Sequence, residues 1–295
     1  MIDYRYHIYS LAAVFLALAV GIVIGTSFAR SSPPAEMLRG TVRRYEGDMR
    51  NLRNEIRKAS EEADKAEAFA KTCQDFCKTV LPIVVKGKLA GRNVAIIRTG
   101  DYDELEGGVR QALEAAGAQV TGVTIMSRSF PFDDNEKIAE ALLECGITPG
   151  EEGVEARDKL FSVIAETICT AKHSDVLPRL EEAGIAQFSG DYYRYNALVV
   201  LVGGARTSAA NAAETMDARL IAQFAKQGAT VVGCEGSNAA SSYVLEWHKT
   251  GVASVDNSET AMGQLALVYA LNGEIANFGC KESADRLIPQ TLEIK

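Results

Sequence analysis

The stretch NVAIIRTGDYDELEGGVRQALEAAGAQVTGVTIM, residues 93–126, decides the fold. Residues 93–98 form a short apolar run that ends in polar residues, and residues 118–126 form a second apolar run. Between them, residues 104–117 have the apolar spacing of a helix and end at a glycine. A strand, a helix and a strand in this order predict two parallel strands joined by a crossover helix, and therefore an α/β fold.

The same alternation of strands and helices continues to the end of the chain. Apolar runs at 197–205, 229–235 and 252–257 predict further strands, and amphipathic segments follow each of them. Residues 130–190 read as a helical middle section. We therefore predict one domain over 82–295, flavodoxin- or Rossmann-like, with a parallel sheet covered by helices on both faces. About 210 residues are enough for such a domain to bury a full core.

Ligands of parallel α/β sheets bind at the carboxyl ends of the strands. No G-x-G-x-x-G follows the first strand and no P-loop occurs in the chain, so the sequence offers no evident cradle for nucleotide phosphates. The nature of a bound cofactor is therefore not predicted. The polar and small residues at the predicted strand ends are the candidates for a binding site: Thr99, Gly100, Asp101, Gly203, Gly204, Glu235, Asp256 and Asn257.

The segment VVGCEG, residues 231–236, resembles a nucleophile elbow, in which a strand-to-helix turn exposes a reactive side chain. Val232, however, stands where a small residue is expected, and the sequence does not place a histidine base beside Cys234. We favour a buried thiol at a strand end, with a hydrolase that uses Cys234 as the weaker alternative. No convincing catalytic constellation is present, so the chain is not predicted to be an enzyme.

The N-terminal segment carries an uncharged apolar run from Ile8 to Phe28. A helix of about 20 apolar residues crosses a hydrocarbon core of roughly 30 Å, whereas the apolar core of a signal peptide has roughly 7–15 residues. Ser27 and Ala29 form a small-x-small pattern, which leaves a cleaved signal as the alternative. We predict a tail and an uncleaved transmembrane helix over 1–32, with its span at 8–28, because the next segment continues as a helix.

Two features next to one another predict self-association. Ala13, Ala17, Gly21 and Gly25 form a stripe of small side chains that lets two membrane helices approach closely. A heptad seam then predicts a parallel coiled-coil stalk over 33–81, bounded by Pro33-Pro34 and Pro82. The alternative is an amphipathic helix packed on its own domain. The seam consists of Leu38, Val42, Tyr45, Met49, Leu52, Ile56, Ala59, Ala63, Ala66, Ala70, Cys73, Cys77 and Val80.

Soft-metal ligands are sparse in this chain. There are six cysteines, and only Cys73 and Cys77 lie one helical turn apart. Two parallel chains would bring four sulfurs together, which suits a soft cation such as Cu(I). An interchain disulfide and plain apolar seam packing are the other interpretations. A copper ion bound by Cys73 and Cys77 is therefore the metal site that the sequence suggests.

Composition limits the partners. The formal net charge is −8, which argues against a nucleic-acid partner. A stretch rich in arginine follows the apolar run, from Arg30 to Lys58. It is suited to anionic lipid headgroups or to the solvated face of the stalk.

Two blocks of the sequence resemble a known family. YRYHIYSLAAVFLALAVGIVIGTSF (4–28) and GVASVDNSETAMGQLALVYALNGEIANFG (251–279) are similar to the mycobacterial copper transport protein B (MctB-like) membrane proteins. The order of anchor, coil and α/β domain is similar too. The resemblance implies a membrane protein of copper homeostasis that moves copper out of the cell, with its large domain outside the cytoplasm. It carries no copper-ligand motif onto this chain.

Two observations stand against parts of that implication. Arg5 precedes the apolar run, while Arg30, Arg39, Arg43 and Arg44 follow it, a bias that places the large domain in the cytoplasm. One apolar helix also cannot line a pore, so a transport pathway needs several copies. Some relatives are discussed as envelope proteins that act with cell-division or cell-wall machinery. A scaffold that recruits such partners through its coil is therefore the alternative function.

Overall fold

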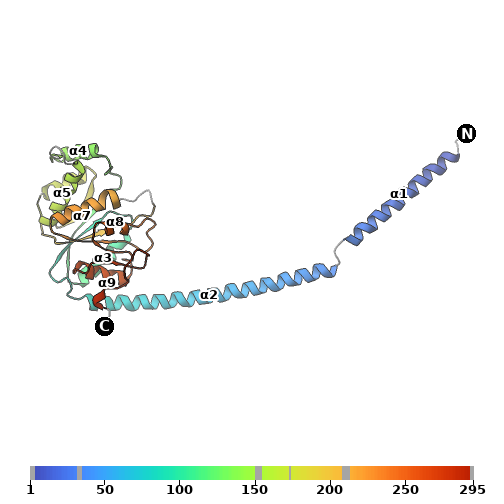
Figure 1. Ribbon diagram of the computed structural model, residues 1–295, viewed down its shortest axis with the longest axis horizontal. Coiled ribbons are helices and arrows are strands. Elements are labelled where there is room, and N and C mark those ends of the chain that lie inside the picture. The colour runs from blue at the N-terminus through green and yellow to red at the C-terminus, as the bar shows by residue number, and fades with distance from the viewer. Residues whose placement is uncertain (1–3, 32–34, 150–154, 173, 208–212, 293–295) are drawn as a thin grey trace. The chain divides into compact units, whose positions relative to one another are not determined.

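A computed structural model describes residues 4–31, 35–149, 155–172, 174–207 and 213–292 (Figure 1). The chain divides into two compact units, Met1–Ala70 and Lys71–Lys295. The first unit holds helix α1 (Tyr4–Ser31) and most of helix α2 (Ala35–Val85), and the second holds the end of α2 and the α/β domain. The predicted break at Pro33-Pro34 lies outside the described residues.

Helix α1 contains the segment His7–Arg30, which is long and apolar enough to cross a membrane. Its 24 residues span about 36 Å at the rise of an α-helix. None of this segment is buried inside the structure. By length and composition the segment is therefore consistent with a membrane anchor or a signal sequence.

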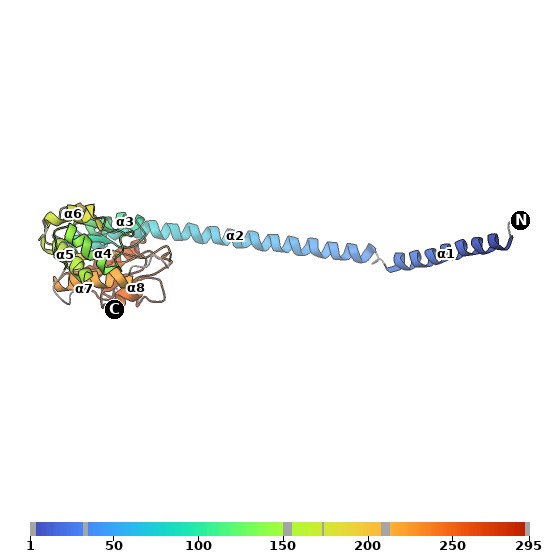
Figure 2. The ribbon, with the colours of Figure 1, turned by 90° about the horizontal axis from the view of Figure 1, so that it is seen from above.

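Helix α2 is a single helix of 51 residues and appears as one continuous ribbon in Figures 1 and 2. In its first half the predicted seam residues Val42, Tyr45, Met49, Leu52 and Ile56 are all more than half exposed. Their association with a second copy stays a prediction.

The prediction that Pro82 ends the stalk is wrong, because α2 continues through Pro82 to Val85. Proline inside a helix removes one hydrogen bond and crowds the preceding turn. Here Leu81 and Val85 on the same turns are buried in the core of the α/β domain. Their burial offsets the cost of the proline.

The domain is built on a seven-stranded sheet with the strand order β3-β2-β1-β4-β5-β6-β7. All neighbouring strands are parallel except β2 and β3. The parallel strands β2-β1-β4-β5-β6 follow the flavodoxin-like order, whose direction reverses between β1 and β4. The strands are β1 (Asn93–Arg98), β2 (Gln119–Met126), β3 (Ala186–Gly190), β4 (Leu198–Val202), β5 (Thr230–Cys234), β6 (Ala253–Val255) and β7 (Asn277–Phe278).

Strand β3 corrects two predictions: the sheet is mixed rather than parallel, and the middle section is not helical up to residue 190. The chain returns to the sheet at the carboxyl end of β2, where the Ser127 N–H donates to the Ile185 carbonyl at 2.9 Å. From this point the chain runs back along β2, so Ala186 pairs with Met126 and Gly190 with Gly122. The polar sequence AQFSG gave no apolar run that would predict this edge strand.

Helices cover both faces of the sheet, as predicted. Residues Val94 and Ile96 of β1 face one core, together with α3, α9 and the end of α2, while Ala95 and Ile97 face the other, with α5 and α7. Figure 1 shows α4, α5 and α7 on one side of the sheet and α3 and α9 on the other. These helices are α3 (Glu104–Ala115), α4 (Asn135–Glu144), α5 (Ala156–Thr170), α6 (Leu177–Glu182), α7 (Ala218–Lys226), α8 (Val244–Lys249) and α9 (Ala261–Leu271).

Candidate functional site

The predicted strand-end residues of β1 and β4 meet at the point where the strand order reverses. The Gly100 N–H donates to the Val202 carbonyl at 3.1 Å, and the Asp101 N–H donates to the Gly204 carbonyl at 3.0 Å. A Cβ atom at Gly100 would lie 2.4 Å from the backbone carbon of Gly203. The loops that follow β1 and β4 therefore pack directly against one another, and their glycines allow this close approach. A ligand role for these residues stays a prediction.

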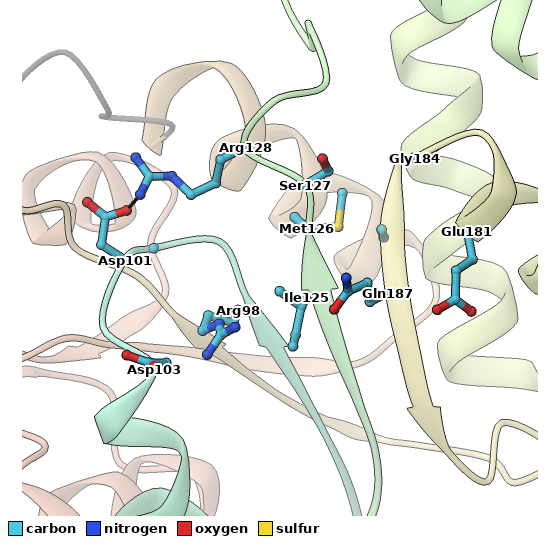
Figure 3. A pocket seen from close by; sticks show the side chains of 12 residues that line it. Arg98, Asp101, Asp103, Ile125, Met126, Ser127, Arg128, Glu181, Gly184 and Gln187 are labelled. Carbon is cyan, nitrogen blue, oxygen red and sulfur yellow. Dashed lines mark ion pairs between the residues drawn. The ribbon is translucent and has the colours of Figure 1, made fainter.

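An open cavity lies next to this point, at the ends of β1 and β2 and the start of β3 (Figure 3). Its volume of about 570 Å³ is within the range of small-molecule sites. Strand β3 forms one wall because it pairs with β2 up to Met126. The cavity is lined by Arg98, Gly100, Asp101, Asp103, Ile125, Met126, Ser127, Arg128, Glu181, Gly184, Ala186 and Gln187.

Asp101 is the most enclosed acid of this cavity, with its side chain 7% exposed. Its carboxylate forms an ion pair with Arg128 and accepts the backbone N–H of Arg206 at 2.8 Å. The Arg206 guanidinium binds Glu104 at 2.8 Å and lies 4.5 Å from the ring centre of Tyr102. These contacts hold the loops that follow β1 and β4 together.

Arg98 is the one cation of the cavity wall whose side chain makes no hydrogen bond or ion pair with another described residue. It is the last residue of β1, and Figure 3 shows its side chain between Ile125 and Asp103. The pKa of Asp103 is lowered chiefly by its side-chain hydrogen bond with Glu104 and also by the charges of Arg98 and Arg206. The cavity therefore combines an unpaired guanidinium with exposed carboxylates, a mixture suited to a small polar molecule.

The predicted residues at the ends of β5 and β6 are tied to the protein itself. Glu235 is fully buried and accepts hydrogen bonds from Ser242 Oγ at 2.5 Å, the Tyr243 N–H at 2.7 Å and Lys281 Nζ at 2.5 Å. Asp256 accepts the backbone N–H groups of Cys280 and Lys281 at 2.8 and 3.0 Å. These carboxylates fasten the segment around Lys281 to the sheet.

Asn257 is also buried at the end of β6, and its side-chain oxygen has no hydrogen-bond partner in the described chain. Its backbone carbonyl accepts the N–H of Thr260, the N-cap residue of α9. Asn257 thus helps to start a helix, while its buried side-chain oxygen has no partner among the described residues.

Asp217 forms a buried polar group that the sequence analysis missed. Its Oδ2 accepts the indole N–H of Trp247 at 2.8 Å. Burial raises the pKa of Asp217 to about 7, Thr99 and Trp247 oppose this rise, and the charge of Glu235 adds to it. Although Thr99 is close enough to lower the pKa, neither its hydroxyl nor Asp217 Oδ1 makes a well-formed hydrogen bond with a described residue. Asp217 is thus a carboxyl group held largely in its neutral form below neutral pH.

The cysteines do not assemble into one site. Cys73 is exposed, Cys77 is partly buried against the domain core, and Cys234 is fully buried. Burial raises the pKa of Cys234 to about 12, so its reactive thiolate is scarce and the geometry does not favour a nucleophile. Within the part of the chain that the structure describes, no group of three or more His, Cys, Asp or Glu residues is placed to hold a metal ion.

Sequence reasoning also missed Arg98, Arg128, Gln187 and Lys281. Arg98 and Arg128 had a detectable signal, because each stands at or just after the end of an apolar strand. Gln187 and Lys281 had none, since one lies on the unpredicted strand β3 and the other far along the chain from the carboxylate that it binds.

These features define a class of protein: an α/β domain joined through a long helix to one N-terminal helix that is long and apolar enough to cross a membrane. The chain belongs to the family described as "Copper transport outer membrane protein, MctB", whose model matches residues 1–289.

Curated relatives match over nearly the whole chain. The copper transporter MctB of Mycobacterium leprae (strain TN) is 30% identical over 326 residues, which cover 98% of this chain and 100% of the relative. The proteins of the same name from Mycobacterium tuberculosis (strain ATCC 25618 / H37Rv) and Mycobacterium bovis (strain ATCC BAA-935 / AF2122/97) are each 25% identical over 315 residues. Those alignments cover 96% of this chain and 98% of each relative. The family resemblance in the terminal blocks is thereby confirmed for the chain as a whole.

Proposed function

We propose that this chain is a single-pass, membrane-anchored protein of copper homeostasis that takes part in moving copper out of the cell. The observation that carries the proposal is the family match over residues 1–289, with relatives named copper transporters over nearly their full length. The span-length apolar segment of α1 supports an uncleaved anchor.

A transport pathway requires more than one copy of the chain. A single helix satisfies its own backbone hydrogen bonds but encloses no channel. The space beside Gly21 and Gly25 is open in one copy, since an added Cβ atom at either residue would meet nothing within 4 Å. Close packing of α1 helices along this small-residue stripe, continued by the exposed apolar seam of α2, supports a parallel homo-oligomer.

Cys73 and Cys77 are the proposed copper ligands. They lie one turn apart on α2, and thiolates prefer soft cations such as Cu(I). One copy offers these two sulfurs, of which Cys73 is exposed and Cys77 is partly buried against the domain core. Because a thiol must lose its proton to bind the metal, affinity should fall as the pH drops below the thiol range.

We place the α/β domain outside the cytoplasm, following the family, although the arginines after α1 argue for the reverse. Exposed Cys280 provides a test in intact cells. A membrane-impermeant maleimide should label Cys280 without lysis, and a Cys73→Ser, Cys77→Ser background removes the other accessible thiols. Labelling only after lysis would contradict this orientation.

The function itself is tested in a deletion strain exposed to copper. The parent gene should restore copper resistance, the Cys73→Ser, Cys77→Ser variant should restore much less, and the matched exposed variant Cys280→Ser should restore it fully. In a competition titration of the purified chain against a Cu(I) chelator, the double variant should lose most of the Cu(I) binding. Unchanged binding in that variant would remove the cysteine pair from the proposal, and a copper-insensitive deletion strain would remove the function.

A second function is favoured by one observation, the exposed apolar side chains along the first half of α2. This surface is also suited to an envelope partner, which would make the chain a scaffold. Division or wall defects of the deletion strain at normal copper would support the scaffold instead of copper transport.

A further inference from the structure

The last turns of α2 have two apolar faces, and the α/β domain covers only one of them. Cys77 packs against the domain core, and Leu81 and Val85 are 8% and 0% exposed. On the other face, Phe76 and Ile83 are 68% and 73% exposed. These two large apolar side chains lie two turns apart on the same face of the helix and leave an apolar surface that a partner could cover.

The exposed face has the spacing of a coiled coil. Phe69, Cys73, Phe76, Val80 and Ile83 follow one another at alternating intervals of four and three residues. In a heptad, Cys73 and the β-branched Val80 take the a positions, and the three larger residues take the d positions. At 3.6 residues per turn, the buried stripe of Cys77, Leu81 and Val85 lies about a third of a turn away.

We propose that a second copy of this chain covers the outward stripe, defined as Phe69, Cys73, Phe76, Val80 and Ile83, as a parallel, in-register helix. The inference deepens the proposed oligomer and rests on the anchor assigned to α1. A heptad stripe requires a helix of the same period as its partner, and α2 supplies one. Two copies anchored in one membrane by the same end place their α2 helices parallel and in the same register.

The residues beside the outward stripe are compatible with this pairing. Thr72 and Thr79 lie next to it and carry no charge, so like charges do not meet across the helices. The pairing also separates the two cysteines. Cys73 of each copy lies on the shared axis, whereas Cys77 faces its own domain core.

Cross-linking of the full-length chain in detergent micelles tests this arrangement. A short bismaleimide should give a covalent dimer in the parent, in Cys77→Ser and in Cys280→Ser, and Cys73→Ser should lose most of it. The Phe76→Glu, Ile83→Glu variant should also lose most of the Cys73 cross-link, because two charges would enter the dry seam. Lys78→Glu is the matched control on the opposite side of the helix and should cross-link like the parent.

Several results would overturn the inference. These are a parent that light scattering shows to be monomeric, an undiminished cross-link in the Phe76→Glu, Ile83→Glu variant, and a cross-link that depends on Cys77 rather than Cys73. The near-ultraviolet signal of buried Trp247 reports whether each variant's domain is folded. Copper binding is measured separately, so a chain that cross-links at Cys73 without binding Cu(I) keeps the interface and loses only the copper proposal.

Discussion

The two halves of the sheet's carboxyl edge have similar polar residues but opposite environments. At the ends of β5 and β6, Glu235 and Asp256 are buried, and their carboxylate oxygens accept hydrogen bonds from groups of the protein itself. At the ends of β1 and β2, Arg98 lines an open cavity, and its side chain makes no hydrogen bond or ion pair with another described residue. We call the edge at β5 and β6 the closed half, because its carboxylates are bound by the protein. We call the edge at β1 and β2 the open half, because Arg98 lines a cavity there.

This difference teaches that a strand-end position does not by itself identify a binding site. A buried charge costs several kcal/mol unless it is paired, so Glu235 and Lys281 depend on each other for the stability of the fold. A partly exposed charge costs little, so the stability of the fold does not depend on a partner for Arg98. Substitutions in the two halves should therefore have very different effects on stability.

The largest effect should come from breaking the closed half. Lys281→Met keeps most of the side-chain volume but leaves the fully buried Glu235 carboxylate without its cation. Loss of one partner of a buried pair costs about 3–5 kcal/mol. We expect the free energy of unfolding, measured by urea denaturation of the chain in micelles, to fall by this amount.

The control is Lys249→Met, because Lys249 forms a 2.6 Å ion pair with Glu246 while its side chain is 69% exposed. Solvent screens an exposed pair, so it contributes little to stability and this variant should differ little from the parent. Equal losses in the two variants would contradict the distinction between a closed and an open half.

The second effect concerns pH and Asp217. Burial raises the pKa of its carboxyl from 3.8 to about 7. Between pH 3.8 and about pH 7, the carboxyl therefore carries a proton in the folded protein but not in the unfolded chain. Unfolding then releases a proton, and stability falls as the pH rises through this window, by at most about 1.4 kcal/mol per pH unit. Above pH 7 and below about pH 4 this contribution no longer changes.

Asp217→Asn should remove this pH dependence and make the protein more stable than the parent above pH 7. The measurement is a series of thermal or urea unfolding curves from pH 4 to pH 8. Asp191→Asn is the control, since Arg194 lowers the pKa of exposed Asp191 and its titration lies below the window. A parent and an Asp217→Asn variant with parallel pH profiles would show that Asp217 is ionised in the folded state.

Much of the fold could be predicted from the sequence, because long apolar runs such as those of β1, β4 and β5 have few alternatives to a buried strand. Strands β3 and β7 could not, since they are short and partly polar and depend on pairing with distant segments. The helical path through Pro82 was missed for a related reason: it depends on the burial of Leu81 and Val85 in a core that only the folded domain creates.

The candidate site was less predictable than the fold. The strand-end rule found Asp101 and Glu235 but could not tell that one lines a cavity while the other is sealed by Lys281. That distinction depends on side chains far apart in the sequence. Asp217 gave no local signal, because a single acid on an amphipathic helix normally faces solvent.

The smallest effect should come from the open half, at Arg98. This guanidinium makes no ion pair or hydrogen bond with another described residue, so Arg98→Ala removes no compensated charge. Substitutions of side chains that belong to no buried core, ion pair or hydrogen-bond network usually change stability by no more than about 0.5 kcal/mol. We expect the urea unfolding curve of Arg98→Ala to overlay that of the parent. A loss of several kcal/mol would show that Arg98 is a structural cation like Lys281, and that the cavity beside it is not kept open for a ligand.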